Sequence, residues 1–476
     1  MIKVIKPAVN TSHSLSVLNP ESVTAIQNAS LRVLERLGVK VMDPVVRSML
    51  QEVGAAVTGE IVRLPEKLVI DALSKSPPTV TFYNRDGGKI STRDGFGFHS
   101  PAPSAIAIME SGGGRRQSTF DDVVNLTRLA DALPGIDFIS PPAIAQDCPA
   151  AYAGVRTAEA VFCNTNKFCL AFPLNLGEAY SWLAMAESAA GSARQLRENP
   201  TIGFAISPSS PLVLAKETSD ILMAGLEHGI PIVTVPGGMT GATTPYSLAG
   251  TLVVDHAEAL LVVTIAQIIR PSNPCVLGLA TATMDMRSGN ISLGKPERTL
   301  ILNAVTPLAH AWGLPGYAPA GLTDSFGLDI QAGAEKMMSL LTQLQSGLEF
   351  GAGAGRYEGG LTTSLEGLLI DHELLQMARR HMQGIRVDED TLAEAAITRV
   401  GQAGNFLSNA HTVIHLRSDE YAPLQLFNRR PKSSGGFLVS EVAHQKAAEI
   451  LAKNLSPVTE AQQMEYQQII HERSGR

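Results

Sequence analysis

Two kinds of sequence segment alternate along most of this chain from about residue 136 onward. A short apolar run rich in β-branched and aromatic residues ends in Pro, Gly, Ser or Thr, and a longer segment with helical spacing of apolar positions follows it. The runs are IDFISPPAIAQD from 136, KFCLAFPLN from 167, TIGFAISPSSP from 201, PIVTVPGGMTG from 231, PCVLGLATATM from 274, LPGYAPAGLTD from 314 and LEFGAGAGRYEGG from 348. They begin about 30 to 43 residues apart, which leaves room for a strand, a loop and a crossover helix. The pattern therefore predicts parallel strands joined by helices.

An eighth strand would close these seven runs into a barrel. Two further segments are candidates for it, VTFYN at 80–84 and the stretch near LQLFN at 424–428. An open doubly wound sheet fits the same alternation. However, GAGAGRYEGG lacks a dinucleotide fingerprint, because the third glycine position of a GxGxxG reading falls on Glu358. We expect an α/β fold of the (β/α)8 TIM barrel type, with the open sheet as the alternative.

The flanking segments differ from the barrel repeat. Helical spacing in ESVTAIQNASLRVLERLG, DPVVRSMLQEVG and LPEKLVIDALSKSP predicts an N-terminal helical layer over residues 1–84. Gly-rich stretches with short apolar runs predict inserted β-hairpins at 85–117. The barrel is then expected over 118–385. DEDTLAEAAITRVGQAG and SEVAHQKAAEILAKNL predict a C-terminal helical extension over 386–476, packed on the barrel.

Composition narrows the class of protein. With 45% hydrophobic and 17% charged residues, the chain has a globular composition. The formal net charge of -7 is spread without a long basic or acidic block, so neither nucleic acid nor a membrane surface is expected as a partner. The most apolar window, 251–269, contains Asp255, His256 and Glu258, which predicts a buried helix rather than a membrane span. The N-terminus lacks the apolar core of a signal peptide, and we expect a cytoplasmic protein.

No familiar metal or hydrolase motif is present in the sequence. The 4 cysteines form no CxxC pair, so neither a disulfide scaffold nor a zinc ribbon is supported. His372 lies beside Asp371 and Glu373, but adjacent residues diverge around a helix and no second motif completes a ligand set. The sequence also lacks a GxSxG elbow, a Walker loop and an HExxH helix. We therefore expect no metal site.

Polar residues gather where the apolar runs end. In a TIM barrel the loops that leave the carboxyl ends of the strands carry the active site. The polar residues at these places are Gln146, Asp147, Asn175, Ser207, Ser209, Thr240, Thr281, Thr283, Asp324, Arg356, Tyr357 and Glu358.

Several segments together resemble the trimethylamine methyltransferase family, which transfers methyl groups from methylamines or quaternary amines to a corrinoid protein. The matching stretches are SPSSPL at 207–212, SLAGTLVVDHAEAL at 247–260, TDSFGLDIQAGAEK at 323–336, EGGLTTSLEGLLIDHE at 358–373 and LERLGVKVMDPVVR near the N-terminus. The likeness spans nearly the whole chain, and it implies a TIM barrel.

The archetypal members of that family carry pyrrolysine just ahead of the segment equivalent to Thr323–Ser325. Ala320, Gly321 and Leu322 stand at that place in this chain. The resemblance is therefore to the non-pyrrolysine branch, in which a glycine betaine methyltransferase is the best understood activity. A quaternary ammonium needs no activation by pyrrolysine, because attack of cobalt(I) on its methyl group releases a neutral tertiary amine.

The resemblance and the rim pattern together nominate a set of site residues. A desolvated cation needs aromatic faces or a carboxylate, and the carboxylate of a betaine needs a donor. We expect Glu358 and Asp324 to be the catalytic carboxylates. Their structural alternatives are a cap or ion pair for Glu358 and a cap of the helix opening at Leu328 for Asp324. The expected substrate-binding residues are Tyr357, Arg356, Phe350, Glu349, His99 and Phe98.

We expect a methyltransferase that moves a methyl group from a quaternary amine, glycine betaine or a relative such as carnitine, to the cobalt(I) of a separate corrinoid protein. The chain has no DxHxxG stretch, so the corrinoid (cobalamin) should arrive on its partner protein rather than be bound permanently. One rival is a non-catalytic quaternary-amine binding or regulatory protein. Another is a TIM-barrel lyase, but the strand ends offer no lysine for it. The oligomeric state is left open, a homo-oligomer included. In the helix after Thr323–Ser325, we expect Gln331 to face the packing and Lys336 the solvent.

Overall fold

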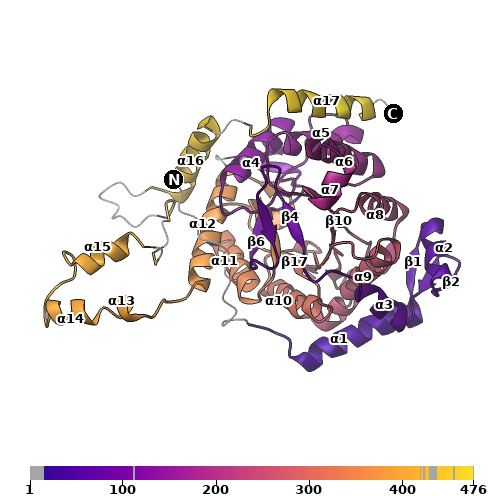
Figure 1. Ribbon diagram of the computed structural model, residues 1–476, viewed down its shortest axis with the longest axis horizontal. Helices are drawn as coiled ribbons and strands as arrows, with labels where there is room; N and C mark the ends of the chain where they lie inside the picture. Colours follow the sequence, from indigo (N-terminus) through magenta and orange to yellow (C-terminus); the bar gives the residue numbers. More distant parts are fainter. Residues whose placement is uncertain are drawn as a thin grey trace.

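A curled sheet of parallel strands forms the centre of the protein. The computed structural model describes residues 15–110, 113–418, 420–421, 424–427, 437–453 and 456–474 of the chain. The sheet has 7 strands in the order β6-β18-β17-β14-β12-β10-β9, and helices surround it in Figure 1. The strands are β6 (Phe98–Pro101), β9 (Cys169–Ala171), β10 (Ile202–Ile206), β12 (Ile232–Thr234), β14 (Cys275–Gly278), β17 (Gly316–Pro319) and β18 (Phe350–Ala354). All their pairings are parallel, which confirms the α/β alternation.

Residues 137–139 link the two edge strands of this sheet. The backbone N–H of Asp137 donates to the carbonyl of His99 in β6 at 2.8 Å. On the other side, the N–H of Ile139 donates to Phe168 O at 2.9 Å, and the N–H of Leu170 donates back to Ile139 O at 2.9 Å. The run from 136 thus bridges β6 and β9, although only an isolated parallel bridge to Cys169 is regular enough to count as sheet.

The central sheet contains one strand from outside the seven runs, but this strand comes from neither of the two candidate segments. β6 falls within 85–117, where only inserted hairpins were expected, and its strand character comes from pairing with β18 rather than from a local pattern. The segment 80–84 instead forms β4 (Thr81–Tyr83), which pairs antiparallel with β5 (Lys89–Ser91). Residues 424–427 form no strand, and Asn428 lies outside the described residues. Both candidates for the eighth strand are therefore wrong.

Aromatic side chains fill the inside of the curled sheet near the amino ends of its strands. Phe82 of β4 stacks on Phe168 with ring centroids 3.8 Å apart and on Phe350 at 4.7 Å. Phe138 meets Phe350 edge to face at 6.0 Å. Burying each of these rings contributes on the order of 2 to 3 kcal/mol. The β4–β5 hairpin therefore plugs one end of the curled sheet, which leaves the carboxyl ends of the strands for chemistry.

Helices that follow the strands form the outer layer. They are α4 (Phe120–Ala132), η2 (Ala150–Tyr152), α5 (Ala153–Phe162), α6 (Leu176–Ala190), α7 (Ala193–Glu198), α8 (Lys216–His228), α9 (Leu248–Ile269), α10 (Pro296–His310), α11 (Ile330–Gln345) and α12 (Leu365–Met382). By length and composition α9 is apolar enough to cross a membrane, yet 78% of its most apolar window is buried inside the protein. The buried helix predicted there is thus confirmed.

The N-terminal layer contains a small sheet as well as helices. Its helices are α1 (Pro20–Arg32), η1 (Val33–Leu37), α2 (Pro44–Glu52) and α3 (Glu66–Leu73). β1 (Val39–Val41), β2 (Ala56–Thr58) and β3 (Ile61–Arg63) pair with β11 (Val213–Leu214) in the order β11-β1-β3-β2. The layer is therefore not purely helical, and β11 ties it to the loop that leaves β10.

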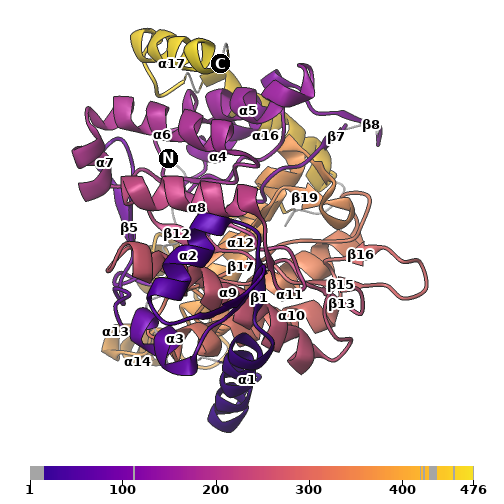
Figure 2. The ribbon, with the colours of Figure 1, turned by 90° about the vertical axis from the view of Figure 1, so that its right-hand side faces the viewer.

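Two more small sheets lie at the carboxyl ends of the central strands. One contains β19 (Arg356–Tyr357), β20 (Thr362–Thr363), β7 (Ala107–Met109) and β8 (Arg115–Gln117). The other contains β13 (Met239–Thr240), β15 (Ala282–Met284) and β16 (Ile291–Ser292). Figure 2 shows these strands on one side of the molecule and β5 on the opposite side. The β7–β8 hairpin lies within 85–117, where the sequence pattern predicts hairpins.

The C-terminal extension packs on the rest of the protein only in part. α16 (Val439–Lys453) packs against α12, and α17 (Glu460–Ser474) packs against α6. By contrast, α13 (Glu389–Leu392), α14 (Glu394–Val400) and α15 (Ala410–Leu416) form an arm that projects away from the central sheet (Figure 1).

Burial gives α9 a pH-dependent weakness. Asp255 is fully buried, and its carboxylate accepts a hydrogen bond from the Thr281 hydroxyl. Burial raises the pKa of Asp255 from 3.8 to about 7. Below about pH 4 this carboxyl is protonated in both the folded and the unfolded chain, whereas above about pH 7 folding must bury a carboxylate that the unfolded chain keeps ionised in water. The raised pKa therefore costs stability progressively as the pH rises from about 4 to 7.

We expect Asp255→Asn to remove that cost. Relative to this variant, the free energy of unfolding of the wild type should fall by about 1 to 2 kcal/mol between pH 4 and pH 8, because local rearrangement relieves part of the full penalty. Urea unfolding of both proteins at the two pH values measures the difference. A difference that does not change with pH would contradict the assignment.

Candidate functional site

Apolar side chains line the carboxyl-terminal side of the inner cluster. Along one strand Phe168 and Leu170 are buried in that cluster, and Phe172, two residues further, packs on it while remaining partly exposed. Ala280 is partly exposed in the same way, and Ser207 and Gly237 are exposed. Phe172 and Ala280 are thus partly exposed hydrophobic residues at this end of the inner cluster, and one of them is an aromatic ring.

The loop after β17 carries Asp324 on the carboxyl-terminal side of the central sheet. The carboxylate of Glu335 in α11 accepts the Thr323 hydroxyl and, at 2.9 Å, the backbone N–H of Asp324. Asp324 itself accepts the Ser292 hydroxyl and the backbone N–H of Leu293 at 2.6 Å. The N-cap of α11 is Asp329, which accepts from Ala332 N at 2.8 Å. Asp324 is therefore no helix cap; it joins the loop after β17 to the end of β16.

Glu358 lies beside Asp324 on the neighbouring loop. Its backbone N–H donates to Ser325 O at 2.8 Å, and the next residue donates to Thr323 O at 3.1 Å. The carboxylate pairs with Arg115 of β8 at 2.6 Å, with its side chain 15% exposed. Glu358 also has a φ of 54°, which is uncommon for a residue with a side chain and is found most often at functional sites and tight turns. The expected ion pair exists, and it holds this carboxylate at the edge of the rim.

Arg356 and Tyr357 point into the protein from the same loop. Arg356 is buried and donates to Gly360 O, its Nε has no partner, and burial lowers its pKa to about 9. The ring of Tyr357 is buried, and the Lys336 ammonium lies 4.2 Å from its centroid. Tyr357 thus packs between β19 and α11, away from the rim.

The remaining candidates lie toward the amino ends of the strands. Phe98 and Phe350 stack within the inner cluster with centroids 5.8 Å apart. Glu349 accepts from Gly316 N at 2.7 Å and pairs with His310 at 2.8 Å. His99 is buried with its Nδ1 3.0 Å from Gln343 Oε1, and burial lowers its pKa to about 3, so the ring is neutral. The structure therefore brings Glu358 and Asp324 together at the carboxyl-terminal side, whereas Arg356 and Tyr357 point into the protein and the other four candidates lie toward the amino ends of the strands.

The buried amine of Lys336 fixes two of the rim loops. Its Nζ donates to Gly321 O at 2.9 Å, to Arg356 O at 2.7 Å and to the Asp371 carboxylate at 2.7 Å. The same oxygen of Asp371 accepts Gly355 N at 2.7 Å. The side chain of Lys336 is 1% exposed whereas Gln331 is exposed, so the orientations expected for these two residues were both wrong. Lys336 ties together the carboxyl ends of β17 and β18.

Arg298 is a rim residue that the sequence reading overlooked. It is 2% exposed, and one of its nitrogens donates to the carbonyl of Pro319 at the end of β17 at 2.8 Å. Its Nε and Nη1 have no partner, and burial lowers its pKa to about 10, so the guanidinium stays charged at neutral pH. The sequence feature that could have identified Arg298 is its spacing from Ile301, Leu302 and Val305, which places it on the apolar face of α10.

Phe172 was overlooked for a similar reason. Its signal is the period of two that joins it to Phe168 and Leu170, which puts all three side chains on the inner face of one strand. An aromatic ring at the last inward position of a strand is the place where a cation entering from the carboxyl end would meet a π face.

Comparisons with known proteins place the chain among amine methyltransferases. The family profile described as trimethylamine methyltransferase (MTTB) matches residues 2–475. Trimethylamine methyltransferase MttB of Desulfitobacterium hafniense is 31% identical over 93% of this chain and 90% of its own length. A glycine betaine methyltransferase of Desulfitobacterium hafniense (strain Y51) is 30% identical over 86% of each chain. Among solved structures, the monomethylamine methyltransferase MtmB of Methanosarcina barkeri matches with a TM-score of 0.52 and 14% identity, over 93% of this chain and 90% of that chain.

Proposed function

Because the chain belongs to the trimethylamine methyltransferase family, we propose that it transfers a methyl group from a quaternary amine to the cobalt(I) of a separate corrinoid protein. The observation that carries this proposal is that the apolar residues Phe172 and Ala280 are partly exposed at the carboxyl ends of the strands, and that the loops bearing the carboxylates Asp324 and Glu358 leave the same ends of the sheet. Exposed apolar residues suit the methyl groups of an onium ion, while the two carboxylates lower the cost of bringing its charge out of water.

In this proposal the fold is a closed (β/α)8 barrel. Residues 137–139 serve as its eighth strand, since they bond to both β6 and β9. The likeness to MtmB, which has a TIM-barrel fold, supports closure. We retain the proposed division into 1–84, 85–117, 118–385 and 386–476, except that the barrel begins at β6 within the second segment and takes residues 137–139 as its next strand.

The chemistry asks little of the protein beyond position. Cobalt(I) supplies the electron pair of the new Co–C bond, the C–N bond breaks, and its electron pair leaves on nitrogen as a neutral tertiary amine. No proton moves, so no side chain has to act as acid or base. Holding the N-methyl group in line with the acceptor turns a bimolecular encounter into an oriented one, which is worth several kcal/mol of the barrier.

The loop in front of Thr323 supports a substrate that arrives already activated. Ala320, Gly321 and Leu322 are all buried, and Gly321 has a φ of 81° with its N–H bonded to Ser339. Small packed residues at that place offer no group able to activate a tertiary amine, and this favours the non-pyrrolysine branch and a quaternary substrate. Arg298, with two donors unused, is the best placed partner for the carboxylate of a betaine.

A Schiff-base lyase is the weaker alternative. Two buried lysine amines next to the central strands, those of Lys167 and Lys336, are already hydrogen-bonded. Lys167 donates to the carbonyls of Ala130, Leu133 and Ile136, and Lys336 donates to two carbonyls and Asp371. A lysine that forms a Schiff base must present a free neutral amine to the substrate.

The decisive experiment follows cobalt(I) absorbance in a mixture of this protein, a corrinoid protein and reductant. Glycine betaine, carnitine, choline and trimethylamine are supplied in turn. We expect methyl–cobalt formation with a quaternary amine that carries a carboxylate and none with trimethylamine. Methylation by trimethylamine alone would overturn the assignment to quaternary amines. Binding of a betaine without any methyl transfer would instead point to the non-catalytic binding protein.

The aromatic contact gives a prediction for substrate affinity. We expect Phe172→Leu to raise the KM for the quaternary amine about 2- to 30-fold, because the contact between a cation and a ring is worth about 0.5 to 2 kcal/mol. The kcat should change less, since the substrate's charge is present before the transition state. Steady-state kinetics measures both, with Phe406→Leu on the distant arm as the control. An unchanged KM would remove Phe172 from the site.

A further inference from the structure

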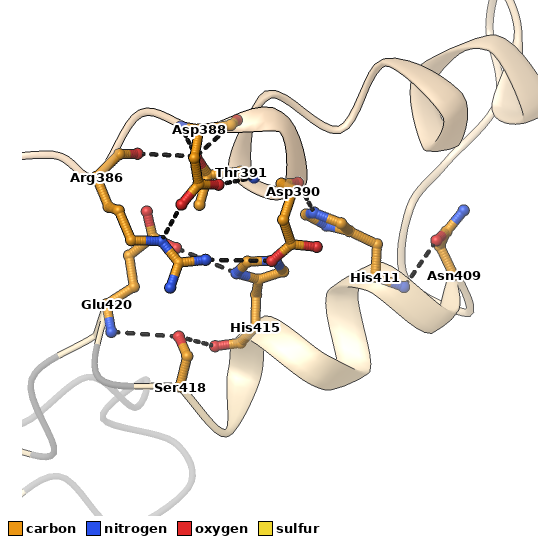
Figure 3. A network of polar contacts seen from close by, with 9 residues as sticks. All are labelled: Arg386, Asp388, Asp390, Thr391, Asn409, His411, His415, Ser418 and Glu420. Atoms are coloured by element: carbon orange, nitrogen blue, oxygen red, sulfur yellow. Dashed lines mark hydrogen bonds and ion pairs between the residues drawn. The ribbon is translucent and has the colours of Figure 1, made fainter.

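The projecting arm carries a cluster of histidine and carboxylate groups that the proposed methyl transfer does not use. Figure 3 shows it between α13 and α15, with Asp390, His411 and His415 turned toward one another. It lies on the arm that leaves the body of the protein, away from the rim of the central sheet. Any function of this cluster is therefore independent of the proposed activity.

The two histidines share one face of α15. They are four residues apart, which places them one turn apart on a helix, and their rings stack with centroids 4.0 Å apart. Asp390 comes from α13, and one ligand atom from each of the three residues lies within 4.8 Å of the others. Imidazole nitrogen and carboxylate oxygen are the ligands that Zn²⁺ and neighbouring divalent ions accept in proteins.

Among the residues that the structure describes, one nitrogen of this cluster is buried without a hydrogen-bond partner. His415 is 9% exposed, and its Nε2 makes no hydrogen bond, although it lies 3.4 Å from Asp390 Oδ2. Its other nitrogen, Nδ1, lies 3.3 Å from Glu420 Oε2. A carboxylate on Nδ1 fixes the tautomer that leaves the lone pair of Nε2 facing the cluster, as the outer carboxylates of metal-bound histidines do.

Both carboxylates and guanidinium groups surround the cluster. Asp388, Asp390 and Glu420 bring three carboxylates, and Arg386 brings one guanidinium, paired with Asp388 at 2.9 Å and with Asp390 at 3.1 Å. Arg380 and Arg417 line the same cavity as Arg386, His415 and Glu420, so guanidinium groups balance these carboxylates, and the ligand atoms rather than the net charge favour a metal ion. A metal ion at Asp390 would replace one contact of Arg386 and leave its pair with Asp388 in place.

We propose that Asp390, His411 and His415 bind one divalent transition-metal ion, with Zn²⁺ as the reference ion. Ligand bonds of about 2.0 to 2.1 Å require the donor atoms to lie roughly 3.3 Å apart, so the three side chains must close by about 1 Å or somewhat more. His411 Nε2 lies 2.9 Å from the backbone carbonyl of Asp390, which keeps α15 against α13 before the ion arrives. The ion then fastens the two ends of the arm together.

The test is metal binding by the full-length protein after treatment with a chelator. Isothermal titration with Zn²⁺ is expected to give one site per chain, and Co²⁺ is expected to give the visible absorption of a nitrogen-ligated tetrahedral site. His411→Ala and His415→Ala should each weaken Zn²⁺ binding at least tenfold, whereas His381→Ala, at an exposed histidine outside the cluster, should not. Glu420→Gln should weaken it about 10- to 100-fold while leaving every ligand in place.

Circular dichroism of the variants separates loss of the site from loss of the fold. If a histidine variant fails to fold, the Glu420→Gln titration and the Co²⁺ spectrum of the unmodified protein still decide. No saturable binding by the wild type, or equal binding by His415→Ala, would overturn the proposal. A Co²⁺ spectrum typical of an octahedral aqua ion would do the same.

Discussion

Lys336→Met is expected to lower the free energy of unfolding by about 3 to 5 kcal/mol, because the change leaves the buried carboxylate of Asp371 without its counter-charge. Both side chains are at most 2% exposed, and the Lys336–Asp371 pair lies at 2.7 Å. The variant also leaves the carbonyls of Gly321 and Arg356 without the donor that they share. Urea unfolding measures the loss. Activity should fall more steeply than stability, because the loops bearing Asp324 and Glu358 begin at these carbonyls and a shift of about 1 Å in an active site can cost about a hundredfold.

Two companion variants make this prediction specific. Lys295→Met removes a half-exposed ion pair with Asp285, 3.0 Å long, and should cost less than about 1 kcal/mol. The double variant Lys336→Met/Asp371→Leu should recover much of the lost stability, because replacing both members of a buried pair with apolar groups removes the uncompensated charge. Equal losses in Lys336→Met and Lys295→Met would show that the buried pair does not hold the rim.

The repeat pattern predicts the central sheet well because each buried parallel strand is a continuous apolar run. Residues 201–206 and 274–278 are such runs, and they form β10 and β14. β6 does not follow this rule. Its sequence FHSP is short and contains both apolar and polar residues, and it forms a strand because it pairs with β18. The same holds for residues 137–139, which bond to two strands yet are barely regular themselves. Pairing between strands that are distant in sequence is a tertiary property that a local pattern does not contain.

The site is harder to predict because the direction in which a side chain points depends on the register of its strand or helix. Asp324 and Glu358 follow the last residues of β17 and β18, so their place at the rim follows from topology alone. Glu349 and Phe350 belong to one apolar run, but their side chains lie on opposite faces of the sheet. Neither residue lies at the carboxyl end of that run. For Lys336, knowing that Asp329 begins α11 would have sufficed, since Lys336 then shares a face with the buried Ala332, Ser339 and Leu340. Without that start point, a charged residue is placed in solvent by default.

The seam between β6 and residues 137–139 gives the other large effect that we expect. Arg379 of α12 is fully buried, and its guanidinium donates to Gly135 O at 3.0 Å, to Gly97 O at 2.8 Å and to the Asp137 carboxylate at 2.6 Å. That carboxylate also accepts the backbone N–H of His99 at 2.8 Å. One side chain from the outer layer thus binds both sides of the place where the regular strands stop. Backbone bonding between β6 and residues 137–139 is sparse, so their contact depends on this arginine more than on any regular ladder there.

We therefore expect Arg379→Met to lower the free energy of unfolding by about 3 to 5 kcal/mol, because the change leaves a largely buried carboxylate and two carbonyls without their hydrogen-bond donor. Its neighbour Arg380 is the matched control, because it is only partly buried and donates to Glu420 O and Gly384 O at 2.7 and 2.8 Å. Arg380→Met should cost no more than about 1.5 kcal/mol. Hydrogen exchange adds a local readout: in Arg379→Met the amides of Ile139 and Leu170 should lose protection before those of β12 and β14. If both variants unfold alike and the seam amides stay protected, β6 and residues 137–139 are held together by their backbone bonds alone, and the arginine only fills space between α12 and the sheet.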